Sequence, residues 1–306
     1  MKILILGYSD LVQRKVIPAI RKFKNVKYDI ASRSKNEHKV GQEIWFRDYS
    51  EAIKRSDAEI VYISLVNSKH YKYALKSLNS LKNVIIDKPI TLSLKHTQKL
   101  LKIAKQKKLL ISEALVFNYH KQFYLIKKII NKNKINFDNI IMQFCIPKPL
   151  KNNFKLSKKM GGGCFNDMAP YAAAMKRLFL GNKIKYMKSI HKYSNKLNES
   201  FCLTVSSERT NFLGIYSHNS EYKNDITFLT KSYLISAERF SAPPANLNLI
   251  VNLRKKNKLK KFIVKKDDIF KNFLSEFFKK YKNKDIYFYH KRILEDAKFI
   301  DKLKNK

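Results

Sequence analysis

The chain has 306 residues, of which 44% are hydrophobic, and this length exceeds what one hydrophobic core usually organises, so we expect two domains. Its formal net charge of +40 would suit a nucleic-acid-binding protein, but only 10 of the 64 basic residues are arginine, and the lysines are spread along the whole chain. We therefore expect no specific nucleic-acid partner and interpret the charge as a compositional bias towards lysine, which would also draw an anionic nucleotide to a cleft.

The first 115 residues alternate short apolar runs with amphipathic stretches. Five apolar runs are predicted as strands: Ile3–Leu6, Tyr28–Ala31, Glu59–Leu65, Asn83–Ile86 and Leu109–Leu115. Four stretches with helical spacing are predicted as helices: Leu11–Phe23, Tyr49–Ser56, Lys69–Leu81 and Ser93–Lys108. Strands that alternate with helices predict a parallel sheet covered on both faces, and we assign residues 1–116 to this α/β domain.

After residue 116 the pattern changes to consecutive strands. A helix at Phe117–Lys134, a strand near Phe137–Ile146 and a helix at Met168–Leu180 come first, and Gly181 would end that helix. The next strand-like runs are Ile184–Tyr193, Phe201–Ser207, Phe212–His218, Ile226–Ala237 and Leu247–Leu253, and two helices, Ile269–Lys282 and Lys291–Lys304, close the chain. Residues 117–306 are therefore predicted to form an α+β domain on an open, mostly antiparallel sheet.

The termini and the cysteines indicate the cellular setting. No run approaches the roughly 18 apolar residues of a membrane span, and the N-terminal apolar run is too short for a signal peptide. Three cysteines without metal-like spacing favour free thiols and predict no metal site. We expect a cytoplasmic protein.

The turn after the first strand is a candidate nucleotide site. It reads Gly7-Tyr8-Ser9-Asp10-Leu11-Val12 where a dinucleotide fingerprint has G-x-G-x-x-G, so only the first glycine is kept. That glycine allows the tight turn that presents helix N–H groups to a pyrophosphate. The alternative interpretation is an ordinary connection between a strand and a helix.

The loop after the second strand suggests which dinucleotide would bind. Ser32-Arg33-Ser34 stands where an acidic residue would hold the ribose 2′-hydroxyl of NAD. An arginine flanked by hydroxyls fits a 2′-phosphate instead, which favours NADP over NAD, although a solvated loop arginine would look the same.

Two further loops end at the same edge of the predicted sheet. Leu65 ends the third predicted strand, and Asn67 and His70 follow it. We expect these three residues to bind the cofactor, although the His70 side chain could face either the cofactor or solvent. Asp87-Lys88-Pro89 ends the next strand at the carboxyl edge, where open α/β sheets bind ligands, which distinguishes Lys88 from the many surface lysines.

The segment GGGCFNDMAPY at residues 161–171 contains three of the chain's seven glycines. Consecutive glycines allow a positive φ and a close approach to another backbone or a ligand. Asp167 is expected to cap the following helix at its N-terminus, with Tyr171 one turn later on the same face. A capped helix after a flexible loop is the simpler interpretation.

Taken together, these motifs resemble the Gfo/Idh/MocA oxidoreductases. The resemblance rests on GYSDLVQRKVIPAI, on His70, on VIIDKP for the family's E-K-P, and on GGGCFNDMAPY for its G-G-G-x-x-x-D-x-x-x-H. It implies a Rossmann domain that holds NAD(P), and a second domain whose open sheet forms the other wall of the active site. The motif lysine maps to Lys88, the aspartate to Asp167 and the histidine to Tyr171.

The tyrosine implies a particular chemistry within that family. It is typical of branches similar to nucleotide-sugar 3-ketoreductases and glucose–fructose oxidoreductase, so the resemblance implies NADPH-dependent reduction of a keto group on an activated sugar, in polysaccharide or modified-sugar synthesis. Lys88 would stabilise the developing oxyanion, Tyr171 would donate the proton and Asp167 would orient the pair. We also expect a homodimer or homotetramer. A non-catalytic NAD(P)-binding regulator or sensor of the same fold is the alternative.

Overall fold

The computed structural model describes residues 1–33 and 40–304, which form two compact units. The first unit comprises residues 1–115 and 270–297, and the second comprises residues 116–269 and 298–306. The predicted domain boundary after residue 116 therefore differs from the observed one by one residue. Segment 270–297 was predicted to belong to the second domain, but it lies in the first unit. Helix α7 (Ile269–Lys282) buries a row of phenylalanines in the first unit, where the ring of Phe278 lies 5.0 Å from that of Phe23.

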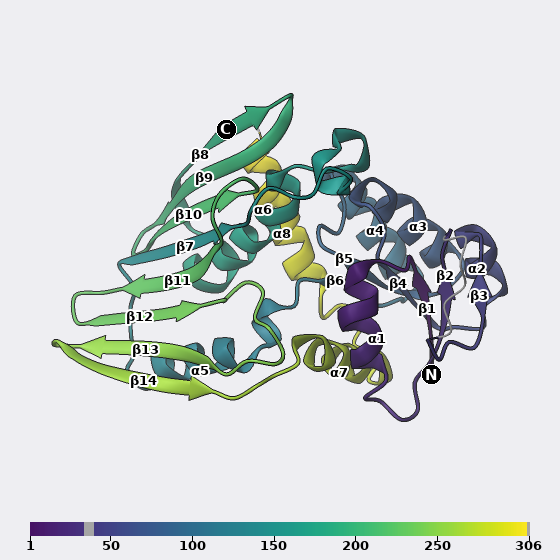
Figure 1. Cartoon of the computed structure of the whole chain (residues 1–306), viewed down its shortest axis with the longest axis horizontal. Helices are drawn as coiled ribbons and strands as arrows, with labels where there is room; N and C mark the ends of the chain where they lie inside the picture. The colour runs from purple at the N-terminus through teal and green to yellow at the C-terminus, as the bar shows by residue number, and fades with distance from the viewer. Residues whose placement is uncertain (34–39, 305–306) are drawn as a thin grey trace. The chain divides into compact units, whose positions relative to one another are not determined.

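The first unit is built on a six-stranded parallel sheet (Figure 1) in the order β3-β2-β1-β4-β5-β6. Strands β1, β4 and β5 consist mostly of apolar residues, as expected for strands covered on both faces. The strands are β1 (Lys2–Leu6), β2 (Lys27–Ala31), β3 (Trp45–Phe46), β4 (Ile60–Ile63), β5 (Asn83–Asp87) and β6 (Ile111–Ala114).

The helices of the first unit follow the predicted helical spacing. A π-helical turn over Val12–Val16 runs into α1 (Ile17–Ile20), where a longer regular helix was predicted. The others are α2 (Tyr49–Arg55), α3 (Asn67–Asn79), α4 (Leu94–Gln106) and α7. Strands β2 and β3 lie on one side of β1, and strands β4, β5 and β6 lie on its other side. The order of the strands therefore reverses direction between β1 and β4, which is where such sheets bind ligands.

The second unit contains an eight-stranded sheet in the order β14-β13-β12-β11-β7-β10-β9-β8, in which every neighbouring pair is antiparallel except β7 and β10. The fold class predicted for both halves is confirmed. The strands are β7 (Asn139–Cys145), β8 (Ile184–Ser194), β9 (Leu197–Ser207), β10 (Asn211–Ser217), β11 (Lys223–Leu229), β12 (Tyr233–Glu238), β13 (Leu249–Lys255) and β14 (Lys258–Val264).

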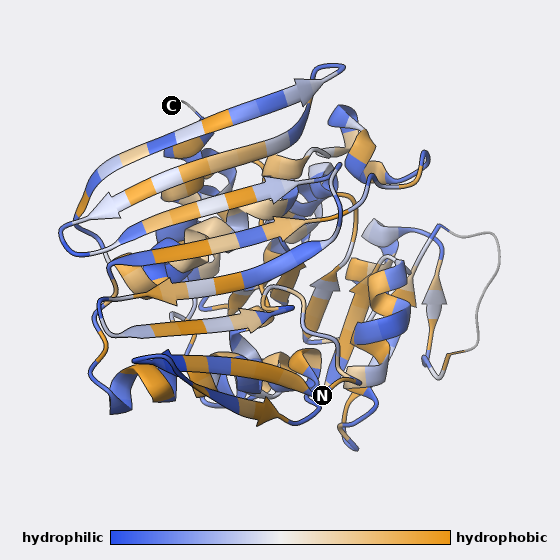
Figure 2. Ribbon diagram, turned by 60° about the vertical axis from the view of Figure 1, so that its left-hand side comes forward, coloured by the Kyte–Doolittle hydropathy of each residue, from blue (hydrophilic) through white to orange (hydrophobic). Residues whose placement is uncertain are grey.

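Helices cover one face of this second sheet. Helix α5 (Lys121–Lys132) packs on β13 and β14, α6 (Cys164–Met175) packs on β9 and β10, and the end of α8 (His290–Lys304) reaches β8 through a bond from Ser189 Oγ to the Leu303 carbonyl oxygen. Figure 2 shows hydrophobic and hydrophilic residues alternating along these strands. The sheet therefore has one face under helices and one face without them.

Three strand predictions differ from the structure. The single strand expected at Ile226–Ala237 is two strands, because the Thr230 hydroxyl accepts the N–H groups of Ser232 and Tyr233 and turns the chain. Strands β3 and β14 were not predicted, since the first has two residues and the second is rich in lysine. Among the described residues, no helix is long and apolar enough to cross a membrane.

Candidate active site

Gly7 forms the turn at the point where the winding of the first sheet reverses. Its φ is +100°, and a Cβ atom there would lie 2.2 Å from the carbonyl oxygen of Ser64 at the end of β4. Only glycine therefore allows β1 and β4 to approach this closely and then turn into the helix that begins at residue 10.

Ser9 stands at the position of the second fingerprint glycine. Its hydroxyl accepts the N–H of Val12 at 3.2 Å and bonds the hydroxyl of Ser64 at 2.8 Å, so it caps the helix and ties it to β4. Val12, at the third glycine position, is completely buried and packs in the core. Asp10 pairs with Arg14 on the surface, and the Leu11 side chain is exposed.

The loop after β2 carries the predicted cofactor-selecting arginine. The Arg33 side chain is exposed, and its guanidinium carbon lies 5.3 Å from the ring centre of Tyr49, at the start of α2. Ser32 is buried, and its N–H donates to the carbonyl oxygen of Phe46 on β3. Ser34, also predicted to bind the cofactor, lies outside the described residues.

These residues fit a dinucleotide. The glycine turn puts the first N–H groups of a helix at the carboxyl end of β1, and such groups have no carbonyl partner within the helix and suit a pyrophosphate. An exposed arginine after β2 supplies a cation for a 2′-phosphate. The residues that would hold the cofactor are Gly7, Ser9, Asp10, Leu11, Ser32 and Arg33.

Asp87 ends β5 inside a hydrogen-bonded network. Its carboxylate accepts the hydroxyls of Tyr62 at 2.7 Å and Ser64 at 2.5 Å. Burial raises the pKa of Asp87, and burial beside this carboxylate raises the pKa of Tyr62. Since Ser64 also bonds Ser9, one chain of hydrogen bonds joins the carboxyl ends of β1, β4 and β5.

His70 is completely buried, which corrects the expectation that its side chain faces the cofactor or solvent. Its Nδ1 lies 2.8 Å from the carbonyl oxygen of Pro89, and its Nε2 lies 2.9 Å from that of Leu65. Burial lowers the pKa of His70. In its neutral form the ring donates to only one of these two oxygens. It packs between the loops after β4 and β5, next to the half-buried Lys88 and the cis peptide bond between Lys88 and Pro89. Asn67, also predicted to bind the cofactor, is buried at the start of α3.

In the second unit, the glycine run brings the chain into α6. Gly161 and Gly163 have φ of +78° and +100°, and a Cβ atom on Gly162 would lie 2.4 Å from the carbonyl oxygen of Lys155. The N–H of Phe165, in the first turn of α6, donates to Asn198 Oδ1 at 2.8 Å. Asn198 on β9 thus satisfies an N–H that the helix leaves unpaired.

The predicted capping role of Asp167 is wrong. Helix α6 begins at Cys164 after Gly163, so Asp167 already lies within the helix. Its Oδ2 atom instead lies 2.9 Å from Nε2 of His218 and 2.7 Å from Nζ of Lys155. The carboxylate and the imidazole are both buried, with 11% and 4% of their side chains exposed, so solvent weakens this interaction little.

Tyr171 lies one turn after Asp167 on the same helix. Its ring packs against Phe117, with centroids 5.9 Å apart, and edge-on against Phe144, with centroids 5.2 Å apart. These contacts hold the ring of an otherwise flexible side chain in one orientation.

The structure thus assembles the predicted residues in two groups. The nucleotide-turn residues, Asp87, His70 and Lys88 gather at the carboxyl edge of the first sheet, and Asp167 and Tyr171 lie on α6 of the second unit. Sequence reasoning missed His218, Lys155 and Asn198. His218 had one usable signal, because a polar residue directly after an apolar strand often belongs to a site. Among the described residues, no group of three or more His, Cys, Asp or Glu could hold a metal ion.

Comparison with known proteins finds a family match for the N-terminal part of the chain. Residues 1–115 match the model of the Gfo/Idh/MocA oxidoreductase family, which has an NAD-binding Rossmann fold. The Rossmann fold that the resemblance implied is thereby confirmed, and it agrees with the reversal of winding at Gly7.

Curated relatives extend the similarity into the second unit. A dTDP-3,4-didehydro-2,6-dideoxy-alpha-D-glucose 3-reductase from Actinomadura kijaniata is 21% identical over 279 residues, which are 87% of this chain and 83% of that protein. A protein of the same name from Saccharopolyspora spinosa is 24% identical over 213 residues, 68% of this chain and 64% of that protein.

Solved structures share the fold over the whole chain. A 3-ketoreductase from Actinomadura kijaniata, in complex with NADP and TDP-benzene, has a TM-score of 0.94 at 19% identity and covers 100% of this chain and 97% of its own. An aldose–aldose oxidoreductase from Caulobacter crescentus has a TM-score of 0.86 at 11% identity, with 100% and 96% covered.

Proposed function

We propose that the protein reduces a keto group on a nucleotide-linked sugar with NADPH. The observation that carries this proposal is that three relatives from three organisms share one name, a dTDP-hexose 3-reductase, and that the first of them aligns over 87% of this chain. Structures have also been solved of two variants of that 3-ketoreductase. In one a lysine is changed to alanine, and in the other a tyrosine is changed to phenylalanine. These are the residue types that we assign to catalysis.

A bound NADPH supplies the hydride that the carbonyl carbon accepts. The carbonyl oxygen gains negative charge as the new C–H bond forms, and we assign its stabilisation to the ammonium of Lys88. Tyr171 then donates its phenolic proton to that oxygen, so the ketone becomes an alcohol and the phenolate takes a proton back from solvent. Asp167 orients this part of α6 through His218 and Lys155.

One experiment tests the reaction. Purified protein is mixed with NADPH and a panel of keto nucleotide sugars, and the absorbance of the reduced nicotinamide is followed. We expect it to fall with at least one of them. If it persists with every keto sugar while NADPH binds normally, the non-catalytic regulator of the same fold is favoured.

We also infer that the protein is a homodimer or a homotetramer. The helix-free face of the second sheet exposes a row of neighbouring side chains on three strands: Ile190, Cys202 and Ile215, which face one another in register. Ile190 and Ile215 are 63% and 44% exposed. Apolar side chains gathered on an open sheet face favour contact with a second copy.

A further inference from the structure

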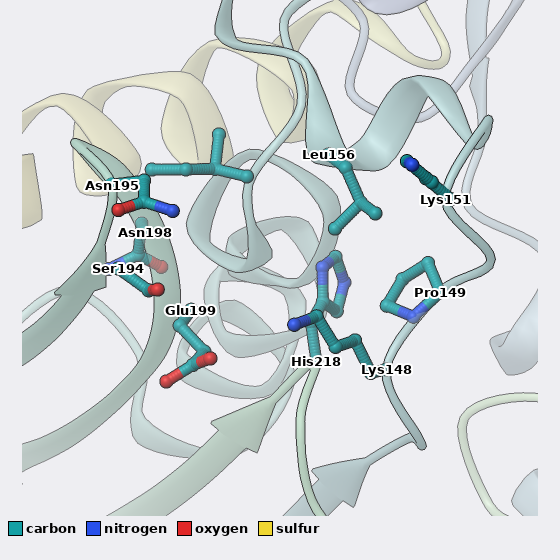
Figure 3. A pocket seen from close by; sticks show the side chains of 10 residues that line it. Lys148, Pro149, Lys151, Leu156, Ser194, Asn195, Asn198, Glu199 and His218 are labelled. Carbon is teal, nitrogen blue, oxygen red and sulfur yellow. The ribbon is translucent and has the colours of Figure 1, made fainter.

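A cavity of about 510 Å³ lies within the second unit, beside the start of α6. Figure 3 shows Ser194, Asn195 and Glu199 on one side of it and Lys148 and Pro149 on the other, with His218 and Leu156 between them. The lining comes from the segment after β7, the β8–β9 hairpin and the end of β10: Lys148, Pro149, Lys151, Leu156, Ser194, Asn195, Leu197, Asn198, Glu199 and His218.

The polar side chains of this cavity favour an anionic ligand. Lys148 and Lys151 bring two ammonium groups from one short segment, and Ser194 and Asn195 add hydrogen-bond donors from the hairpin opposite. Glu199 is the one carboxylate in the lining. It accepts a hydrogen bond from Asn219 Nδ2 at 2.9 Å, and its Oε2 atom lies 3.5 Å from Lys192 Nζ. Its charge is therefore already partly balanced.

The apolar part of the lining suits a flat ring. Pro149, Leu156 and Leu197 are all partly buried and lie in the wall of the same cavity. Ligand pockets for small molecules usually have volumes of about 300–1,000 Å³, lined by apolar surface with a few polar groups that set the orientation. The cavity meets both conditions and is large enough for a nucleoside diphosphate.

His218 connects this cavity to the proposed catalytic helix. Its ring lines the cavity, while its Nε2 atom bonds Asp167 one turn before Tyr171. A ligand held by Lys148 and Lys151 would therefore lie beside the carboxylate network of α6.

We propose that this cavity binds the nucleoside diphosphate part of the substrate, with Lys148 and Lys151 on the phosphate oxygens and the base against Leu156 and Leu197. The assignment rests on the proposed function, which provides a nucleotide-linked sugar. The reacting sugar would then extend from the cavity towards Tyr171, past His218.

Calorimetric titration of the full chain with dTDP and with UDP, in the presence of saturating NADP, tests the site. The double variant Lys148→Ala/Lys151→Ala should bind the diphosphate at least about tenfold more weakly, because each lysine provides a charge-assisted contact. The control is Lys158→Ala/Lys159→Ala, which removes two exposed lysines of the same connecting segment that do not line the cavity. It should bind like the wild type, and NADP affinity should be unchanged in both variants.

Three results would overturn the assignment. They are no binding of either diphosphate to the wild type, wild-type affinity in the Lys148/Lys151 variant, or an equal loss of affinity in both double variants, which would indicate general charge attraction.

The outcomes also distinguish failure of this site from failure of the proposed reaction. If keto sugars are reduced but the Lys148/Lys151 variant binds dTDP normally, only the cavity assignment fails. If that variant loses dTDP selectively but no keto sugar is reduced, only the proposed reaction fails.

Discussion

The Nε2 atom of His218 lies 2.9 Å from Oδ2 of Asp167, and both side chains are buried. The two residues are 51 positions apart, on the segment after β10 and on α6, so this bond fixes the helix against the sheet. Lys155 bonds the same oxygen from the segment that leads into the glycine run. The carboxylate is thus an anchor for three segments.

We expect His218→Leu to lower the free energy of unfolding by about 1–3 kcal/mol, because it leaves a buried carboxylate without one of its partners. Denaturant unfolding measures the change. Lys192→Met is the control, since it removes an exposed partner of Glu199 and should cost less than about 1 kcal/mol. In a double variant with Asp167→Asn, the losses should be less than additive. Full additivity would contradict a direct interaction.

Tyr171→Phe should reduce kcat by about 10²–10⁴-fold, the usual contribution of a positioned proton donor. The variant keeps the ring between Phe117 and Phe144, so NADPH affinity and folding should change little. Steady-state kinetics with NADPH and the keto sugar that the wild type reduces measures the effect. Tyr216→Phe is a matched control, because that buried hydroxyl bonds Met142 Sδ and has no assigned role. Turnover by Tyr171→Phe at the wild-type rate would make Tyr171 a packing residue and favour Lys88 as proton donor.

Local patterns in the sequence were enough to predict most elements of the fold. The continuous apolar runs of the first unit and the alternating runs of the second identify their own sheets, because periodicity is a local property. The grouping of segment 270–297 with the first unit depends on where α7 packs, and no local pattern contains that information.

The site was predictable only where a motif is contiguous. Gly7 and Lys88 stand out because each follows a strand at the binding edge of a parallel sheet. The role of Asp167 was missed because its partner His218 is brought to it by the packing of α6 on β10. His70 was misjudged for a similar reason, since its two carbonyl partners lie on different loops.

Arg33→Ala should weaken NADPH binding by roughly tenfold to a hundredfold, the loss of a charge-assisted bond of about 1.5–3 kcal/mol. NADH binding should change little, because NADH has no 2′-phosphate for the arginine to hold. Calorimetric titration of wild type and variant with both cofactors measures this. Arg14→Ala removes a surface arginine paired with Asp10 and serves as the control. Equal affinities of the wild type for NADPH and NADH would refute the assignment of Arg33.

The stability of the protein should fall on acidification, partly through His120. Burial lowers the pKa of this histidine, whose Nδ1 atom accepts the N–H of Gln122 at the start of α5. The unfolded chain therefore takes up the proton first, and stability is lost as the pH falls from about 6.5 towards the lowered pKa.

His120→Asn should lose less stability than the wild type between pH 7 and pH 5, because asparagine caps a helix but does not titrate there. Thermal unfolding across this pH range measures the difference. His120→Ala separates the two effects, since it removes the cap as well and should be less stable at pH 7. An unchanged pH dependence in His120→Asn would show that other groups account for it.

The last prediction concerns the open face of the second sheet. Ile215 on β10 faces Cys202 on β9, which in turn faces Ile190 on β8, so the three form one row across the strands. Within β10, Phe212 and Tyr216 are buried, whereas Leu213 and Ile215 are exposed. If this row is the contact between copies, Ile215→Lys places a charge within it and should shift the assembly towards a monomer of 36.1 kDa. Light scattering at micromolar concentration measures the mass, and Asn211→Lys, at the exposed start of the same strand, is the control that should leave the assembly intact. A wild-type protein that is already monomeric, or an Ile215→Lys variant with the wild-type mass, would exclude this face as the interface.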